Sequence, residues 1–222
     1  RQLCAIALVT ITGSPALVAA YGRDVGVESQ QGAPEATAED LRASAEVVRR
    51  ATARSEALIG ALLTLERADA PRQADEAVDL SRLADNRLEA GAAALAARGI
   101  ELRRDLRPAP VRGDHVLLEQ LVENLLANAA AYVENDAAGH RWIAVSTATE
   151  GGTALFRVAN SSTAIDAMDL DRLFERFRRL DGPRLDAAPR RESGGHGLGL
   201  SIVRAVARHH GGDAVARALI AR

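Results

Sequence analysis

The stretch Ser193–Val203, Ser-Gly-Gly-His-Gly-Leu-Gly-Leu-Ser-Ile-Val, places three alternating glycines directly before an apolar helical pattern. These glycines are Gly195, Gly197 and Gly199. A backbone without Cβ atoms folds tightly and approaches a ligand closely. The helix that follows offers free N–H groups and a partial positive charge in its first turn. The stretch therefore predicts a phosphate site, although a glycine-rich turn before an ordinary helix would give the same pattern.

The composition is typical of a globular protein with an aliphatic core. Of the 222 residues, 47% are hydrophobic and only 3% are aromatic, so Ala, Leu and Val must form most of the core. The 28 basic and 30 acidic residues nearly balance, which gives no electrostatic case for a nucleic-acid partner. A single cysteine, Cys4, rules out an internal disulfide and a cysteine-based zinc site.

The first 70 residues are expected to form a helical hairpin. The apolar stretch Leu3–Tyr21 is marginal in length for a membrane span, and we expect a buried or partner-facing helix over Leu3–Ala20. A second helix is expected from Thr37 to about Arg67. Two helices alone bury little surface, so the pattern favours a dimeric four-helix bundle, and the alternative is one helix packed on its own domain. The second helix has a heptad-like seam of Leu41, Ser44, Val48, Ala51, Ser55, Leu58, Leu62 and Leu65.

The remaining sequence predicts a linker and then a domain of mixed helices and strands. The linker is expected at Ala68–Glu76, which contains Pro71. The expected elements are a helix at Leu80–Ala97, a strand at Ile100–Leu106, a helix at Val116–Tyr132 capped by Asp114, a hairpin of Trp142–Ala148 and Ala154–Ala159, a short helix at Asp169–Leu180, a lid at Asp181–Gly194, and a last helix closed by Gly211 and Gly212.

The helix at Val116–Tyr132 carries Gln120, Asn124 and Asn128 at four-residue intervals along the border of its apolar face. Asparagine has a low helix propensity, so two asparagines in mid-helix indicate a function. An amide oxygen is a ligand that Mg²⁺ accepts, which makes Asn128 a candidate magnesium ligand. A solvated polar edge is the alternative interpretation of the same stripe.

The order of these segments resembles the ATP-binding half of bacterial sensor histidine kinases, of the GHKL superfamily. Three segments match the family's N, F and G2 boxes: Gly113–Tyr132, Leu173–Leu180 and Gly194–Val203. The resemblance extends over about Val78–Gly212, and Leu62–Asp69 resembles the end of the dimerisation hairpin of actinobacterial members. It implies an α+β fold, with an N-terminal helical hairpin over residues 1–70 and a two-layer α/β sandwich ATP-binding domain over residues 76–222.

The resemblance also implies ATP and Mg²⁺ as cofactors. Asn128 would bind Mg²⁺, and Asn124 would lie beside it at the phosphates. The family phosphorylates a histidine and passes the phosphoryl group to the receiver domain of a response regulator. The resemblance further implies a homodimer in the cytoplasm that is attached to the membrane through a sensor segment upstream. The implied ATP-binding residues are Asn124, Asn128, Tyr132, Asn160, Phe177, Gly195, Gly197, Leu198 and Gly199.

The sequence departs from the family pattern at several positions. Asn160 stands at the position of the family's aspartate that hydrogen-bonds to adenine. Ser162 and Ala164 stand at the glycine positions that follow. Ala131 replaces a frequent basic residue, and the chain ends before the family's closing strand, so a domain truncated at its C-terminus is expected.

The most serious departure is the absence of an acceptor histidine. The counterpart of the acceptor motif, Thr10–Pro15, keeps little beyond its proline, and the first 114 residues contain no histidine. We therefore expect a chain that binds Mg-ATP but does not phosphorylate a histidine in its own hairpin. A degenerate, non-catalytic module is the alternative. ATPases of the gyrase or Hsp90 kind are disfavoured because they use a glutamate at the position of Asn124, and a GHKL serine kinase is disfavoured by the heptad helix.

Overall fold

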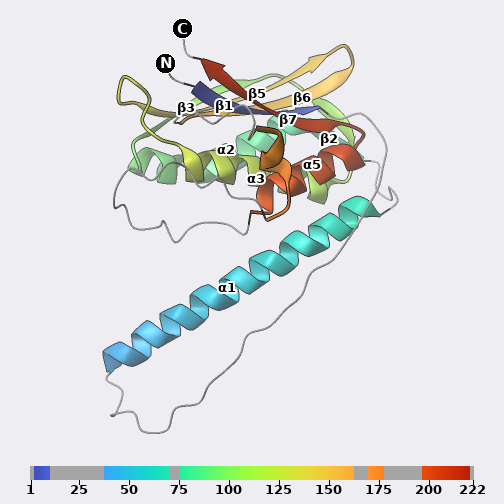
Figure 1. Cartoon of the computed structure of the whole chain (residues 1–222). Helices are drawn as coiled ribbons and strands as arrows, with labels where there is room; N and C mark the ends of the chain where they lie inside the picture. Colours follow the sequence, from blue (N-terminus) through green and yellow to red (C-terminus); the bar gives the residue numbers. More distant parts are fainter. Residues whose placement is uncertain (1–2, 11–37, 71–75, 163–169, 178–196, 221–222) are drawn as a thin grey trace.

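The computed structural model describes residues 3–10, 38–70, 76–162, 170–177 and 197–220. Helices cover one face of a five-stranded sheet, and one long helix extends beyond this layer (Figure 1). The predicted α+β class with a two-layer sandwich is therefore confirmed. The elements are β1 (Leu3–Thr10), α1 (Ala38–Asp69), β2 (Glu76–Asp79), α2 (Leu80–Ala97), β3 (Ile100–Leu106), β4 (Pro110–Gly113), α3 (His115–Tyr132), β5 (Arg141–Glu150), β6 (Thr153–Ser161), η1 (Asp171–Phe174), α5 (Gly199–His209) and β7 (Asp213–Ile220).

The strand order of the main sheet is β3-β5-β6-β1-β7, and β2 pairs with β4 in a separate small sheet. β3 and β5 run parallel, and the other neighbours in the main sheet are antiparallel. The predicted hairpin of β5 and β6 is confirmed. Its turn residues Gly151 and Gly152 have φ of 56° and 81°, the left-handed conformation that a tight hairpin turn requires.

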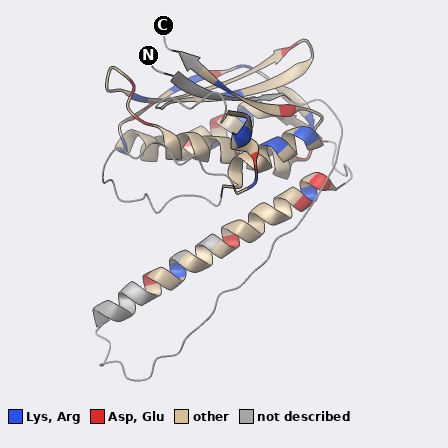
Figure 2. Cartoon of the chain, viewed as in Figure 1, with Lys and Arg blue, Asp and Glu red and all other residues tan. Residues whose placement is uncertain are grey.

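The core lies between the sheet and the helix layer, and α3 contributes its most buried face. Leu118, Leu121 and Val122 have no exposed surface, because these apolar residues of α3 recur at the helical period on the face that packs on the sheet. Opposite them, Phe156 of β6 is also fully buried. Charged residues of both signs are interspersed over the outside of the domain and along α1 (Figure 2).

The predicted helix over Leu3–Ala20 is wrong for its described part, because Leu3–Thr10 is the strand β1. β1 lies between β6 and β7 and is antiparallel to both. A short apolar run has the same appearance in a buried helix and in a buried strand. The β-branched residues of this run favour the strand, and the position between two strands supplies backbone partners on both sides. The sequence analysis also missed β7, which follows the helix α5.

The predicted second helix is confirmed as α1, but no described helix pairs with it. Its last turns pack on the domain, where Leu65 and Ala68 are buried. Further toward the N-terminus, Val47 and Val48 are both 64% exposed. The packing of one helix on its own domain therefore holds only for the C-terminal part of α1. No helix in the described ranges is long and apolar enough to cross a membrane.

The short helix expected over Asp169–Leu180 is wrong for residues 175–177, and residues 169 and 178–180 lie outside the described ranges. Asp171–Phe174 forms a single 3₁₀ turn, Glu175 is extended with ψ of 140°, and Phe177 has φ of 63°. Phe174 is consequently buried while Phe177 is exposed, so the two rings do not share a helical face. The predicted lid at Asp181–Gly194 lies outside the described residues.

Replacement of Leu121 by alanine should lower the free energy of unfolding by about 2–5 kcal/mol, because the side chain is fully buried and the gap cannot close completely. Urea denaturation measures this loss. Val116→Ala on the same helix is the matched control, since Val116 is 50% exposed, and should change stability by less than about 0.5 kcal/mol. Equal losses in the two variants would contradict the buried face assigned to α3.

Candidate functional site

Two of the predicted motifs meet where the N-terminus of α5 approaches the middle of α3. A Cβ atom added to Gly199 would lie 3.1 Å from Oδ1 of Asn124. This distance is tighter than an ordinary van der Waals contact, so a glycine at this position permits the close approach of the two helices. The structure thus brings together residues that lie far apart in the sequence.

The start of α5 has the backbone features of an anion site. Gly197 has φ of 69°, a conformation that side chains rarely adopt, and it leads directly into the helix. Leu198 occupies the N-cap position without a capping side-chain hydrogen bond. The side chain of Leu198 is buried in the core, so the group it can offer a ligand is its backbone. Gly195 lies outside the described residues.

The amide stripe of α3 is only partly satisfied by the protein. Nδ2 of Asn124 donates to the carbonyl oxygen of Gln120 at 2.8 Å, and its Oδ1 is the atom nearest Gly199. Asn128 lies one turn further and is half-buried. Within the ranges that the structure describes, its amide makes no hydrogen bond. Two amide side chains therefore follow each other along α3, and that of Asn124 lies beside the start of α5.

The other predicted site residues lie at the end of α3 and in β6. Asn160 is buried near the end of β6, and its Nδ2 donates to the carbonyl oxygen of Tyr132 at 3.2 Å. This bond joins the end of α3 to the sheet, a structural role that the sequence analysis missed. The contact of Asn160 with adenine stays a prediction. Tyr132 and Phe177 are 52% and 56% exposed, so their rings are accessible to a ligand.

The residues present suit a magnesium ion that is held mainly by its phosphate ligand. The described residues contain no cluster of three or more His, Cys, Asp or Glu side chains that would hold a metal alone. Mg²⁺ commonly takes one or two protein oxygens and completes its shell with phosphate oxygens and water. The amide of Asn128, which makes no hydrogen bond to the part of the chain that the structure describes, fits this role.

Asp114 fixes the start of α3. Its Oδ1 accepts hydrogen bonds from the backbone N–H groups of Val116 and Leu117, and its Oδ2 accepts from Nε of Arg67 at 2.7 Å. Burial raises the pKa of Asp114, but the hydrogen bonds from Arg67 and from the two backbone N–H groups outweigh burial, so the pKa lies below its ordinary value. The predicted cap is confirmed, and its ion pair with α1 was not foreseen.

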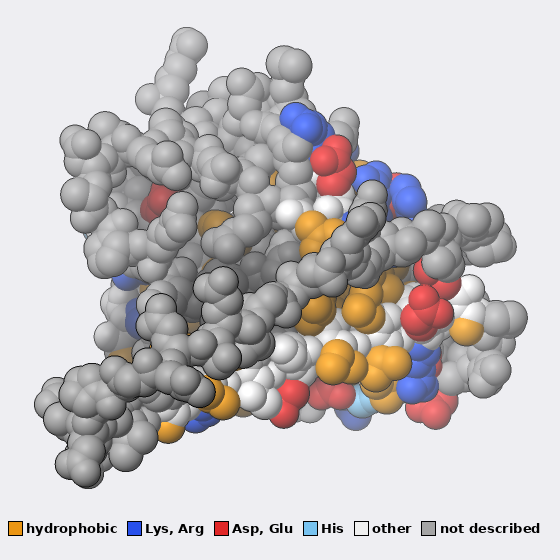
Figure 3. All heavy atoms as spheres, turned by 60° about the horizontal axis from the view of Figure 1, so that its bottom comes forward, with side chains coloured by type: hydrophobic (Ala, Val, Ile, Leu, Met, Phe, Trp, Pro, Cys, Tyr) orange, Lys and Arg blue, Asp and Glu red, His pale blue; other side chains and the backbone are white. Residues whose placement is uncertain are grey.

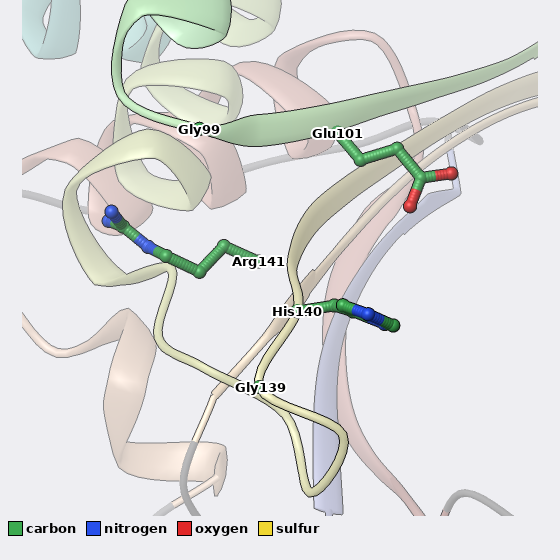
Figure 4. Close-up of a pocket in the computed structure, with 5 residues that line it drawn as sticks. All are labelled: Gly99, Glu101, Gly139, His140 and Arg141. Carbon is green, nitrogen blue, oxygen red and sulfur yellow. The ribbon is translucent and has the colours of Figure 1, made fainter.

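A separate shallow hollow lies at the β3 edge of the main sheet. It is lined by Gly99, Glu101, Gly139, His140 and Arg141 (Figure 4). The side chain of Arg141 points away from those of Glu101 and His140. It donates to the backbone oxygens of Arg98 and Val133. None of the predicted site residues lines this hollow.

Residues 113–218, which contain both motifs, match the family described as histidine kinase-, DNA gyrase B-, and HSP90-like ATPase. The chain belongs to this ATPase family. Its relatives include sensor histidine kinases of actinobacteria, in agreement with the resemblance drawn from the sequence.

The chain is 40% identical to the sensor protein CutS of Streptomyces coelicolor over 159 residues, which are 72% of this chain and 36% of CutS. It is 35% identical to the probable sensor histidine kinase TcrY of Mycobacterium tuberculosis over 183 residues, 81% of this chain and 35% of TcrY. The chain thus spans about a third of the length of these relatives.

Solved structures support the fold. Full-length ShkA in complex with AMPPNP aligns with a TM-score of 0.58 at 22% identity, covering 78% of this chain and 34% of ShkA. The histidine kinase AdeS of Acinetobacter baumannii aligns with a TM-score of 0.53 at 18% identity, covering 82% of this chain and 84% of AdeS.

Gly199→Ala should destabilise the protein, because the new methyl group forces Asn124 to move. Gly91→Ala is the matched control: a Cβ at Gly91 meets nothing within 4 Å, so alanine in mid-helix should stabilise the protein by about 0.5–1 kcal/mol. Thermal unfolding of both variants measures the difference. A stabilising effect at both positions would show that α5 does not approach Asn124 closely.

Asp114→Asn should remove a stabilising contribution that depends on pH. Because the folded pKa of Asp114 is lowered, this contribution is fully present above the ordinary pKa of about 3.9 and is lost as the pH falls through the folded pKa. Urea denaturation of wild type and variant at several pH values measures it. The difference in stability should be constant near neutral pH and should shrink on acidification. A difference that grows as the pH falls would contradict the lowered pKa.

Proposed function

We propose that this chain is a transmitter module of a two-component sensor kinase and that it binds Mg-ATP between α3 and the start of α5. The observation that carries the proposal is the close approach of Gly199 to Asn124, where an added Cβ atom would lie 3.1 Å from Oδ1 of Asn124. The amide oxygen of Asn124 thus lies beside a helix N-terminus that has no side-chain cap and favours anions, and Asn128 follows one turn further along α3. Phosphates and a hard cation would find their preferred partners on neighbouring helices.

Each group has a defined task in this proposal. The backbone N–H groups at the start of α5 would hold the phosphates, and Gly197 and Gly199 would leave room for them. Asn128 would hold Mg²⁺, which neutralises charge on the phosphates when bound. Tyr132, Asn160 and Phe177 would line the adenine side. Phosphoryl transfer is catalysed mainly by positioning and charge stabilisation, so a site of amides and glycines is sufficient on the nucleotide side.

The phosphoryl acceptor would be a histidine that passes the group to the receiver domain of a response regulator. Residues 1–114 contain no histidine, so the acceptor would lie outside them. This absence favours a second candidate function, a non-catalytic module that binds ATP or assembles with a kinase without transferring a phosphoryl group. The two functions differ in whether a phosphohistidine forms.

Homodimerisation through α1 is also part of the proposal. Five large apolar side chains of this helix are more than 40% exposed: Val47, Val48, Ile59, Leu62 and Leu63. Hydrophobic side chains gather among charged ones on the face of the molecule where α1 lies (Figure 3). A single helix that exposes such a surface is stabilised by packing against other helices. In a sensor kinase this module would lie in the cytoplasm, below a membrane-anchored sensor segment.

Asn128→Ala should weaken Mg-dependent ATP binding by at least about tenfold, because the metal loses its protein oxygen ligand. Titration of a fluorescent ATP analogue with and without Mg²⁺ measures the effect. Asn86→Ala, an exposed position on α2, is the control and should bind as the wild type does. Undiminished Mg-dependent binding by the Asn128 variant would exclude the assigned role, and failure of the wild type to bind would exclude an ATP site.

Incubation with ATP labelled in its γ-phosphate distinguishes the kinase from the non-catalytic module. No acid-labile, alkali-stable label should form on residues 1–114 of this chain, because they contain no histidine. A kinase should label the histidine of an added hairpin from a related sensor kinase, whereas a non-catalytic module should not. Acid-labile, alkali-stable label within residues 1–114 would contradict both the kinase and the non-catalytic module as proposed.

A further inference from the structure

His210 is a buried histidine at the end of α5 that lies outside the proposed nucleotide contacts. It is 4% exposed. Its Nδ1 lies 2.8 Å from the carbonyl oxygen of Val206, and its Nε2 accepts a hydrogen bond of 2.9 Å from the backbone N–H of Asp114. Because Nε2 accepts and Nδ1 faces a carbonyl oxygen, the ring is neutral with its proton on Nδ1. Both ring nitrogens are therefore used to fix backbone groups.

Gly113 is matched to this ring. A Cβ atom at Gly113 would lie 2.0 Å from Cδ2 and 2.3 Å from Nε2 of His210, distances that real atoms do not adopt. The ring therefore occupies the space that any side chain at position 113 would need. A glycine directly before α3 allows His210 to reach the N-cap residue Asp114.

Asp114 is consequently held from three sides. Its backbone N–H is bound by His210 of α5, and its carboxylate binds both Arg67 of α1 and the first N–H groups of α3. A further contact joins α5 directly to α1, since Nδ1 of His209 lies 2.8 Å from the carbonyl oxygen of Ala68. The start of α3 thus has a fixed position relative to the end of α5.

The contacts of α3 with α5 define a clamp with two ends. At one end His210 binds Asp114, and at the other Gly199 meets Asn124. The helix between these contacts is about 15 Å long in α3 and about 16.5 Å long in α5, at 1.5 Å per residue. Because the lengths nearly match, the bond at His210 determines the register in which Asn124 and Asn128 face the start of α5.

We infer that His210, with Gly113, is a positioning residue for the nucleotide site: it sets the register of α3 against α5 and thereby the place of the two amide oxygens. This inference rests on the proposed ATP site. A residue that merely fills the core would change stability but not the affinity of the folded protein for the nucleotide.

The first experiment compares Mg-ATP affinity in variants that circular dichroism shows to be folded. His210→Leu removes both hydrogen bonds while keeping apolar volume, and should weaken binding about tenfold, as loss of outer contacts does at metal sites. His210→Gln keeps an acceptor for the N–H of Asp114 and should recover most of the affinity. His140→Gln, at an exposed position, is the control and should bind as the wild type does. Wild-type affinity in folded His210→Leu would overturn the inference.

The second experiment is a double-mutant cycle on stability, and it needs no nucleotide. Gly113→Ala should be strongly destabilising in the wild type because of the clash with the ring, and much less so together with His210→Ala. Equal effects of Gly113→Ala in both backgrounds would show that the His210 ring does not pack against Gly113.

The two experiments separate the inference from the proposed function. Absence of Mg-ATP binding in the wild type would refute the ATP site, whatever the cycle shows. Normal binding by the wild type together with normal binding by His210→Leu would leave the ATP site standing and refute the role of His210. Faster hydrogen exchange at Val116 and Leu117 in His210→Leu is the local signature expected if the start of α3 is released.

Discussion

The close approach of α5 to α3 is the constraint on which the rest of the domain depends. Gly199 allows it, and the buried leucines of α3 fill the space between these helices and the sheet. If the two helices stood further apart, the amides of α3 and the N-terminus of α5 would be separate surface features. Packed together, they bring a helix N-terminus that favours anions next to an amide oxygen of the kind that a hard cation accepts. The hydrophobic core and the candidate site therefore have the same geometric origin.

The elements that hydrophobic periodicity governs were predictable from the sequence. The helices α1, α2 and α3 and the hairpin of β5 and β6 lie where apolar spacing and glycine turns predicted them. β1 was not predicted, since its identity depends on two strands that lie far away in the sequence. The turn after Phe174 was missed for a related reason: local spacing predicted a helix, but the tertiary position of Phe174, beneath the Arg204 guanidinium, favours a short turn.

The sequence alone suggested the residues of the candidate site, but not the residues that position them. Residue type and spacing identified Asn124, Asn128 and the glycines. The supporting bonds join different elements: the backbone N–H of Asp114 donates to His210, and the side chain of Asn160 donates to the carbonyl oxygen of Tyr132. Such bonds leave no periodic signal, because each pairs two positions far apart. Buried polar residues at the ends of helices and strands are the one indication that a sequence offers, since burial demands a partner.

The position of β1 has a consequence for how the chain reaches this structure. Cys4 pairs with both Ser161 and Leu219, so β1 can complete its pairing only after β6 and β7, which lie much later in the sequence, have been made. Contacts between such distant positions form slowly, because a long loop must close before they gain any energy. Until then β6 and β7 each expose an unpaired edge, the feature by which sheets associate with other chains. The completion of the sheet is thus a late event, and it joins the two ends of the described chain side by side (Figure 1).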